Sequence, residues 1–557
     1  MRILRKPASS STANFALVSA TLRCEERLAF NANDIVVLVG SNNSGKSTFL
    51  RGVKDFIEDS DSYNVIFSGL AFSSFSKAKI QERLESYYHI LTDGNLRYVL
   101  DNRGSRDFYI HEDSEGPSSF RLRQGAGAFV SLLNSEKRLS LSNDVQTIDL
   151  LASKPRHPYH IFMIDPDKLA SFSRNIEEAF GVGFTITRIG NPIRAYVGTQ
   201  FRKSDTVSAD QEIPKQGVSL LTQGDGLRSY IGMLAEIQAM SHPIVLLDEP
   251  EAFLHPPQAR RFGRTLVREF EGDRQAFIAT HSSHILQGIL SGDTQRVRVI
   301  RLDRKSKEKY ATVLENNQLA AAIDHPSVAN SNLLDALFFE QAVVCEGDAD
   351  CKIFDWIDRR KQPSERVDRF WYSAGGKHQV TKISALLNSF GVDWRVILDL
   401  DALQDWGIVS SLAKMKGLGL DGYKARINHA LKNAQDSDLK VIREGALRAL
   451  RDSCDDETAL REASRAMEGR KLSSSLKRYG IGAFRNGQER EAVESLLSML
   501  EDRGICLLRK GELESYAPTV GKHGPVWVSS VLETPAIYSE EIGALGKDID
   551  KALCPLS

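Results

Sequence analysis

A glycine-rich segment, residues 40–48, has the residue types of a binding site for a nucleoside triphosphate. Its sequence is Gly-Ser-Asn-Asn-Ser-Gly-Lys-Ser-Thr, and it follows an apolar run over residues 35–39. A buried strand that turns through glycines into a helix presents backbone N–H groups to phosphate oxygens. Lys46 would reach the β and γ phosphates, and the Ser47 hydroxyl would hold Mg²⁺. The segment therefore predicts an ATP site in which the binding residues are Gly40, Asn43, Gly45, Lys46, Ser47 and Thr48.

Two later apolar runs end in residues that suit hydrolysis of the nucleotide. The run 244–247 ends in Asp248, which could order the Mg²⁺ shell, and Glu249, which could polarise the attacking water. A further run ends at His281, where the side chain could sense the γ phosphate. The alternatives are an acidic helix cap and an ordinary surface or core histidine. Because the phosphate loop needs an acidic partner, we expect Asp248 to bind the nucleotide and Glu249 and His281 to be catalytic.

Four carboxylates follow two apolar runs in the second half of the chain. They are Glu346 and Asp350 after the first run, and Asp399 and Asp401 after the second. Strand, helix, strand, with acids at the strand ends, is the order of a parallel sheet whose ligands bind at its carboxyl edge. Carboxylate oxygens suit Mg²⁺ or Mn²⁺, and two such ions can activate water and stabilise a leaving phosphate oxygen. Each acid alone would be a solvated loop residue or a helix cap, so only the combination predicts a metal site.

Composition limits the class of protein. With 557 residues, 41% of them hydrophobic and 26% charged, we expect a globular chain of two or three domains. The formal net charge of −1 gives no overall attraction to nucleic acid, so such binding would depend on local basic patches. The six cysteines form no C-x-x-C pair, which argues against a zinc ribbon and a disulfide framework. Without a run of about 18 apolar residues, we expect a cytoplasmic protein with no membrane span.

The elements that would position these residues form two α/β units. Three strands over residues 14–40 lead into the phosphate loop, and an inserted lobe, about 55–215, separates it from Asp248. Within this lobe, segments 63–70 and 159–164 have strand-like patterns, and 76–90 has a helical one. The second unit begins near residue 335 and ends with a strand over 505–508. Residues 408–500, rich in Ala, Leu, Lys, Arg and Glu, predict a helical insertion in this unit.

The order of the first set of motifs resembles the ATP-binding-cassette class of ATPases. The segment Thr222-Gln223-Gly224 stands where that class has its signature sequence, in place of the usual Leu-Ser-Gly-Gly-Gln. The resemblance implies that Thr222 and Gly224 bind nucleotide. In that class each nucleotide lies between the phosphate loop of one protomer and the signature of another, which implies a homodimer or a dimer of dimers. Residues 248–256, Asp-Glu-Pro-Glu-Ala-Phe-Leu-His-Pro, are similar to the RecF-like and OLD-like (overcoming lysogenization defect) branches.

The second set of motifs resembles the Toprim domain of topoisomerases, some primases and OLD-family nucleases. Its pattern here is Glu-Gly-x-x-Asp from Glu346, then Asp-x-Asp from Asp399. Residues 330–347 look like the OLD domain junction, and Gly375-Gly376-Lys377 looks like part of the Toprim pattern, although Lys377 could equally be a solvated turn lysine. The resemblance also covers Lys510-Gly-Glu-Leu-Glu514. It implies that Lys510 neutralises a phosphate in the transition state and that Glu512 or Glu514 completes the metal shell.

Together the resemblances imply an OLD-family fold of the α/β class. An ABC-type ATPase domain over 1–330 would precede a Toprim domain over 335–557 with its helical insertion. They imply an ATP-regulated DNA endonuclease that uses Mg²⁺ or Mn²⁺, has Glu346 and Lys510 as catalytic residues, and acts in bacterial anti-phage defence. A partner protein or nucleic acid could regulate it. The alternative is a clamp or sensor in DNA repair that uses ATP but cuts no DNA.

Overall fold

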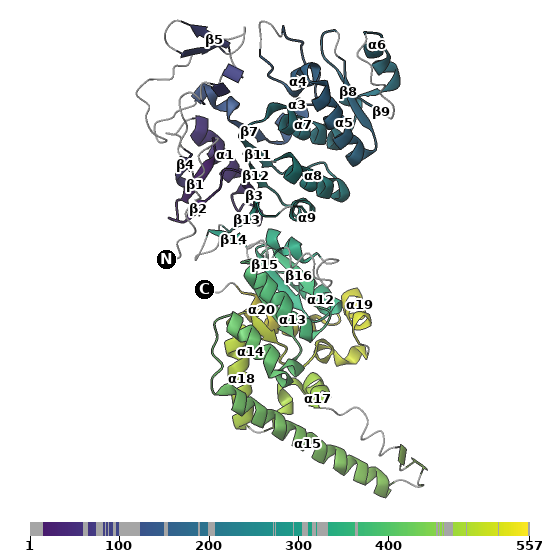
Figure 1. Ribbon diagram of the computed structural model, residues 1–557. Coiled ribbons are helices and arrows are strands. Elements are labelled where there is room, and N and C mark those ends of the chain that lie inside the picture. Colours follow the sequence, from purple (N-terminus) through teal and green to yellow (C-terminus); the bar gives the residue numbers. More distant parts are fainter. Residues whose placement is uncertain are drawn as a thin grey trace. The chain divides into compact units, whose positions relative to one another are not determined.

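The computed structural model divides into two compact units, Met1–Phe338 and Phe339–Ser557 (Figure 1). The described residues are 15–58, 65–73, 79–99, 123–149, 154–187, 190–198, 207–303, 310–314, 319, 332–362, 366–452, 455, 457–458, 460–461, 472–485, 487–521 and 523–554, except for 80–81, 84, 87–88, 93–95, 271, 273 and 293. In this part of the chain, every helix is too short or too polar to cross a membrane.

A six-stranded sheet forms the centre of the first unit. Its order is β14-β13-β3-β12-β11-β7, and only the edge strand β14 is antiparallel to its neighbour. Every residue of β3, β11 and β12, three of the four inner strands, is buried, as expected for apolar parallel strands covered on both faces. The strands are β3 (Ile35–Val39), β7 (Val130–Leu133), β11 (Ile244–Asp248), β12 (Gln275–Ala279), β13 (Val297–Leu302) and β14 (Ala311–Leu314).

Helices cover both faces of this sheet. Helix α1 (Lys46–Glu58) shares one hydrophobic core with the sheet and with the small sheet β2-β1-β4. Helices α7 (Asp225–Met240) and α8 (Pro256–Glu269) lie on the other side of β11 and β12 (Figure 1). The remaining elements near them are β1 (Leu17–Leu22), β2 (Arg27–Ala29), β4 (Phe67–Phe72), α3 (Ser135–Ser140) and α9 (Ser283–Leu290).

The inserted lobe differs from the sequence prediction in one segment. Residues 159–164, predicted as a strand, belong to helix α4 (Pro158–Ile164). Proline fits the first turn of a helix, and the His157 side chain accepts a hydrogen bond from the Tyr159 backbone N–H, so these two residues start the helix. Most of the predicted helix 76–90 lies outside the described residues. The other elements of the lobe are β5 (His89–Thr92), β6 (Leu96–Val99), α5 (Pro166–Phe180), β8 (Gly183–Ile186), β9 (Ala195–Gly198), α6 (Val207–Gln216) and β10 (Val218–Ser219).

The second unit contains a four-stranded sheet in which all strands are parallel. Its order is β16-β15-β17-β18, so the two inner strands are those that precede Glu346 and Asp399. The strands are β15 (Gln341–Cys345), β16 (Arg369–Ser373), β17 (Asp393–Leu398) and β18 (Ile505–Leu507). Because all four strands are parallel, the residues that follow them lie at one edge of the sheet. The predicted α/β class with parallel sheets is confirmed.

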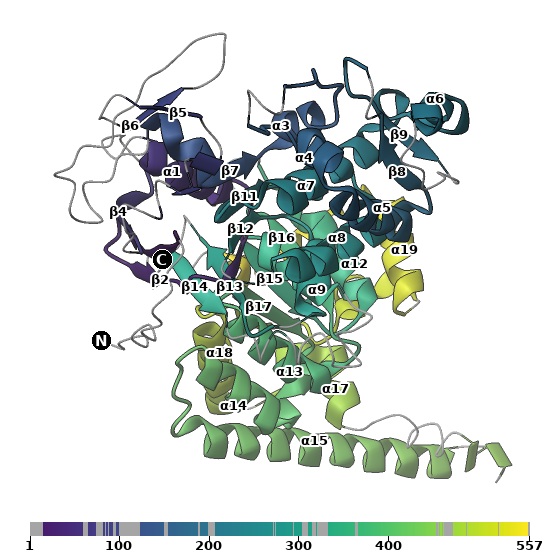
Figure 2. The same ribbon diagram turned by 45° about the horizontal axis from the view of Figure 1, so that its top comes forward.

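Helices surround this sheet and fill the connection from β17 to β18. Helix α15 is long and lies beside α18 in both views (Figure 2). Helices α12, α19 and α20 share a core with β15 and β18. The helices are α12 (Asp348–Asp358), α13 (Lys377–Ser389), α14 (Trp406–Met415), α15 (Tyr423–Asp452), α17 (Leu472–Tyr479), α18 (Gly487–Glu501), α19 (Pro525–Glu533) and α20 (Ser539–Leu553).

Candidate active sites

The phosphate loop connects β3 to α1 and encloses the amino group of Lys46. Gly40 and Gly45 have φ values of 142° and 100°, which side chains rarely allow, so glycine permits this turn. The Lys46 amino group donates to the carbonyl oxygens of Gly40 (2.8 Å) and Ser41 (2.9 Å). Burial lowers the pKa of Lys46 to about 8, although the acids opposite it oppose this shift. Among the described residues, the hydrogen bonds of the Lys46 amino group are made to neutral oxygens.

The acids predicted to complete this site lie at the ends of neighbouring strands. The Ser47 hydroxyl donates to the Asp248 carboxylate over 2.7 Å, which joins the start of α1 to the end of β11. The pairing of β11 with β12 brings Glu249 to His281, and their nearest side-chain N and O atoms are 3.8 Å apart. Burial, followed by the charge of Lys46, lowers the pKa of His281 to about 4. The His281 imidazole beside Glu249 is thus neutral near pH 7.

Two residues that hold the chain at Glu249 and His281 were not assigned a role from the sequence. Arg138, fully buried in α3, donates to the backbone carbonyl oxygens of Asp248 (3.0 Å) and Glu249 (2.7 Å). Glu251 accepts from the His281 backbone N–H (2.6 Å) and the Thr280 hydroxyl (2.9 Å). Glu249 itself has a φ of 50°, which is uncommon outside glycine. Arg138 and Glu251 therefore fix the strand ends that carry Glu249 and His281. Glu251 lies within the motif 248–256, whereas Arg138 has no motif spacing that would reveal it.

The signature-like segment lies at the exposed start of α7. Gly224 is the residue before the first turn of this helix, and the Thr222 hydroxyl donates to the Ser219 carbonyl oxygen. A Cβ atom at Gly226 would lie 2.5 Å from the Phe253 carbonyl oxygen, so this turn packs closely against the loop that follows Glu249. Thr222 and Gly224 are both exposed.

At the carboxyl edge of the second sheet, three acids lie together. Carboxylate oxygens of Glu346, Asp399 and Asp401 lie within 4.8 Å of one another. Burial raises the pKa of Asp399 to about 7, although Lys477 opposes this shift. In the described part of the chain, one oxygen of Glu346 (Oε2) and one of Asp401 (Oδ1) are buried without a hydrogen-bond partner. Oxygen donors of this kind fit a hard divalent cation.

Two lysines from distant segments contact these acids. The amino group of Lys377, at the start of α13, lies 3.0 Å from Asp401. That of Lys477, in α17, lies 2.7 Å from Asp399 and 3.9 Å from Glu512. Burial opposes protonation, but the Asp399 carboxylate raises the pKa of Lys477 above its usual value. Lys477 lies in the helical insertion, where no sequence spacing indicated a site residue.

A glycine allows α17 to approach the acids. Gly511, with a φ of 110°, follows β18, and a Cβ atom there would lie 2.0 Å from the Lys477 carbonyl oxygen. The backbone N–H of Glu512 donates to the same carbonyl oxygen over 3.1 Å. This close contact between the β18 end and α17 places Lys477 beside Asp399.

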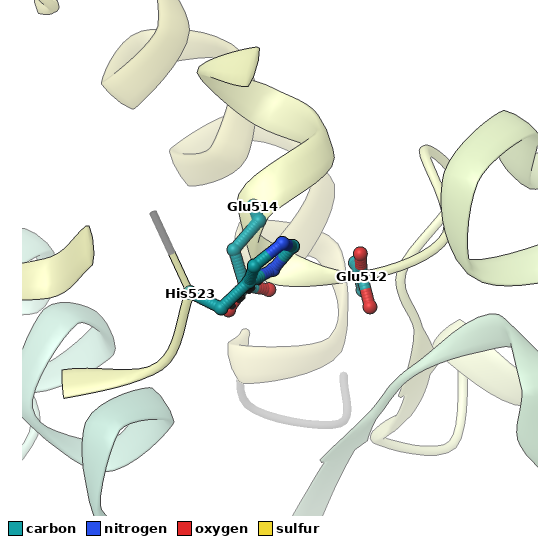
Figure 3. Close-up of side chains that lie close together, drawn as sticks. All are labelled: Glu512, Glu514 and His523. Atoms are coloured by element: carbon teal, nitrogen blue, oxygen red, sulfur yellow. Dashed lines mark ion pairs between the residues drawn. The ribbon is translucent and has the colours of Figure 1, made fainter. Parts of the chain in front are cut away.

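The remaining predicted residues of this site are not part of the three-acid cluster. Asp350 accepts from the Gly347 backbone N–H (2.9 Å) at the start of α12, and burial raises its pKa to about 6. Glu512 and Glu514 form a second cluster with His523, drawn in Figure 3. The exposed Lys510 places its amino group 4.9 Å from the centre of the Tyr516 ring. The lysines in contact with the acids are thus Lys377 and Lys477.

Comparisons with known proteins agree with this division of the chain. Residues 35–287 match the family described as "AAA domain, putative AbiEii toxin, Type IV TA system", and residues 337–401 match "Overcoming lysogenization defect protein-like, TOPRIM domain". The chain is an OLD-family ATPase fused to a Toprim domain. The first match includes the phosphate loop and His281, and the second includes Glu346 and Asp401. The predicted family is therefore confirmed.

A curated relative is the Old nuclease of Escherichia phage P2. The two sequences are 23% identical over 346 residues, which cover 59% of this chain and 53% of the relative. The match to this OLD-family relative thus spans about half of the relative's length.

Solved structures with partial similarity contain heads of SMC proteins. One is a Smc head bound to the C-terminal winged-helix domain of ScpA, with 13% identity and a TM-score of 0.33 over 55% of this chain and 99% of that chain. Another is the SMC head domain from Thermotoga maritima, with 14% identity and a TM-score of 0.29 over 54% of this chain and 97% of that chain. At such scores, the fold class rests on the sheet order and the family matches.

Proposed function

We propose that this OLD-family chain is an ATP-regulated, divalent-metal-dependent DNA endonuclease that acts in bacterial anti-phage defence. The observation that carries the proposal is the cluster of Glu346, Asp399 and Asp401, whose carboxylate oxygens lie within 4.8 Å of one another. Such a cluster at a sheet edge can hold Mg²⁺ or Mn²⁺ against a phosphodiester. The nuclease activity named for the phage P2 relative supports the same chemistry.

Two buried oxygens without hydrogen-bond partners, Glu346 Oε2 and Asp401 Oδ1, are the atoms best suited to bind a metal ion in this cluster. A bound divalent ion would polarise the phosphate and lower the pKa of a water molecule. The protein's own part is to orient the DNA strand and neutralise its charge. Lys477 is within reach of this edge of the sheet and, once a metal ion competes for Asp399, can turn its ammonium group to a phosphate oxygen.

The first unit would regulate cleavage through ATP. Lys46 would bind the β and γ phosphates, while Ser47 and Asp248, already hydrogen-bonded, would hold the Mg²⁺ that accompanies the nucleotide. Glu249 would orient the attacking water. His281, neutral at physiological pH, would report whether the γ phosphate is present through a hydrogen bond. The exposed position of Thr222 and Gly224 supports a homodimer or dimer of dimers in which each nucleotide contacts two chains. A cytoplasmic location and a regulatory protein or nucleic acid belong to the same proposal.

The two lysine contacts favour a second candidate, a DNA clamp or sensor. Lys377 and Lys477 already neutralise part of the charge on Asp401 and Asp399. Acids that bind no metal ion would require such counter-charges. The clamp would nevertheless leave the buried oxygens of Glu346 and Asp401 without a role. This is why we favour the nuclease.

One experiment separates the two candidates. Purified protein is incubated with supercoiled and linear DNA, with Mg²⁺ or Mn²⁺ and with or without ATP. The nuclease predicts nicked or linear products that need metal and disappear in Glu346→Ala. Metal-independent retention of intact DNA, with ATP hydrolysis preserved, would instead identify the clamp.

A further inference from the structure

Helix α8 of the ATPase unit carries four exposed arginines on one face. We call them the arginine stripe: Arg260, Arg261, Arg264 and Arg268. Residues three, four, seven or eight positions apart share a helix face, so these side chains lie along one line. With a rise of 1.5 Å per residue, the stripe is about 12 Å long. The same helix contains one acid, Glu269, so this face is locally basic although the whole chain has a net charge of −1.

A cavity lies between the arginine stripe and α5. Its volume is about 240 Å³, and its lining includes Arg261, Arg264 and Arg268 from α8 and Asn175 and Glu178 from α5. Helices α5 and α8 lie side by side in both views (Figures 1 and 2). Typical pockets for small molecules have volumes of about 300–1,000 Å³. This smaller cavity, with more positive than negative charge around it, therefore suits a single phosphate group.

Two arginines of the stripe also hold α5 in place. Arg261 donates to the backbone carbonyl oxygens of Glu178 (2.5 Å) and Ala179 (3.2 Å), at the end of α5. Arg268 donates to the Asn175 side chain, and its guanidinium lies 3.8 Å from the Glu178 carboxylate. Packing of the two helices is thus enough to explain these two side chains.

Packing does not explain Arg264, which lies between them. Its side chain is exposed and makes no hydrogen bond or ion pair with the residues that the structure describes. It lies three positions from Arg261 and four from both Arg260 and Arg268, and like charges at these spacings repel one another. A bound anion would relieve this repulsion. The planar guanidinium group matches the geometry of phosphate oxygens.

We propose that the arginine stripe of α8 binds the phosphate backbone of duplex DNA, with one phosphate in the cavity. Each strand of a duplex carries one phosphate per about 3.4 Å of helix axis, so a stripe of this length can contact about three. A line of arginines suits a polyanion, whereas a free phosphate ion requires donors that converge on one point. The idea deepens the proposed function and rests on DNA as the substrate. It gives the ATPase unit a share in holding that DNA.

The test measures DNA binding in the absence of cleavage. Full-length protein is titrated with fluorescent DNA duplexes of unrelated sequence in EDTA, over a range of KCl concentrations. Arg264→Gln should weaken binding to all duplexes alike and reduce the slope of log K against log [KCl] by about 1. Arg264→Lys should keep the slope, because it keeps the positive charge. ATP hydrolysis, assayed with Mg²⁺, should stay at the wild-type rate in both variants and serves as the folding control.

Arg51→Gln is the matched control. Arg51 is also exposed, but it lies on α1, which covers the other face of the sheet, so this variant should bind DNA like wild type. An unchanged slope in Arg264→Gln, or an equal loss in Arg51→Gln, would overturn the role of the stripe even if the protein cuts DNA. Weakened binding in Arg264→Gln alone, in a protein that never cuts DNA, would keep the stripe and reject the nuclease.

Two further outcomes would also overturn the proposal. Calorimetry with inorganic phosphate tests the cavity as a site for a free anion. Phosphate binding that Arg264→Gln removes, while DNA binding is unchanged, would identify such a site instead. A wild-type protein that binds no duplex at low salt would reject both the stripe and the proposed nuclease.

Discussion

The two candidate sites differ in how their lysines are held. In the ATPase unit, Lys46 contacts carbonyl oxygens five and six positions away along the chain, at Ser41 and Gly40. In the Toprim unit, Lys477 contacts Asp399 across 78 positions, and Lys377 contacts Asp401 across 24. The environment of Lys46 is thus formed by a local turn, whereas that of Lys477 forms where a helical insertion packs onto a sheet.

This difference in placement gives the lysines opposite electrostatics. Burial against neutral oxygens lowers the pKa of Lys46 to about 8. Bound phosphates would supply the negative charge that stabilises its protonated form. The Asp399 carboxylate raises the pKa of Lys477, which is already paired before any ligand binds. The ATPase lysine is prepared to bind an anion, while at the Toprim acids a metal ion must first compete with an internal cation.

The largest expected effect tests the local site. Lys46→Ala should reduce ATP hydrolysis to background, because the described loop supplies no second cation for the β and γ phosphates. Phosphate release by the purified variant measures this. Mn²⁺ binding to the Toprim acids should remain, which serves as the folding control. Wild-type turnover would show that the loop is not the active site.

The matching change in the assembled site should separate the two activities. Glu346→Ala or Asp401→Ala should abolish DNA cleavage by removing metal ligands, while ATP hydrolysis persists. Asp348→Ala is the matched control, because this neighbouring acid is exposed and lies outside the three-carboxylate cluster. Cleavage by both variants at the wild-type rate, in titrations of Mg²⁺ and Mn²⁺, would reject catalysis by the Toprim acids.

A smaller effect is expected at Glu249, the residue proposed to orient the attacking water. Glu249→Gln should bind ATP but hydrolyse it about 10²–10⁴-fold more slowly, the usual contribution of a positioned base. Equilibrium nucleotide binding and single-turnover hydrolysis distinguish these steps. A variant with unchanged turnover would assign Glu249 to structure alone, with Asp248 as the important acid.

Comparison of two lysines tests geometry against family resemblance. Lys477→Ala should slow DNA cleavage by about 10²–10³-fold, as for loss of one group that stabilises transition-state charge. Lys510→Ala should also impair cleavage, but less, because its amino group lies over the Tyr516 ring. Cleavage rates at saturating metal measure both. The reverse order would mean that the resemblance locates the catalytic lysine better than these contacts do.

The smallest expected effect is a pH dependence specific to Lys46. Its pKa of about 8 means that the free protein loses this positive charge as the pH rises above 8. ATP affinity should therefore fall by about tenfold between pH 7 and pH 9. Lys46→Arg, which stays protonated over this range, should show a flatter profile. Parallel profiles for the two proteins would place the titration elsewhere.

Several features followed from the sequence alone. The phosphate loop and the acids after β11 were predicted because a short stretch of chain contains the whole chemical pattern. The grouping of Glu346 with Asp399 and Asp401 followed from a general rule, that the carboxyl ends of parallel strands meet at one edge. The order of these motifs also gave the OLD family, which the family matches confirm.

Tertiary structure decided which distant side chains complete each site. Arg138 reaches the carbonyl oxygens of Asp248 and Glu249 from a separate helix, and Lys477 reaches Asp399 because Gly511 lets α17 approach. The strand predicted over 159–164 was wrong, because Pro158 and His157 start a helix whose apolar residues face a core that sequence patterns do not locate. A local motif consists of residues close together in the sequence and can be recognised there. These contacts instead depend on packing between segments far apart in the chain.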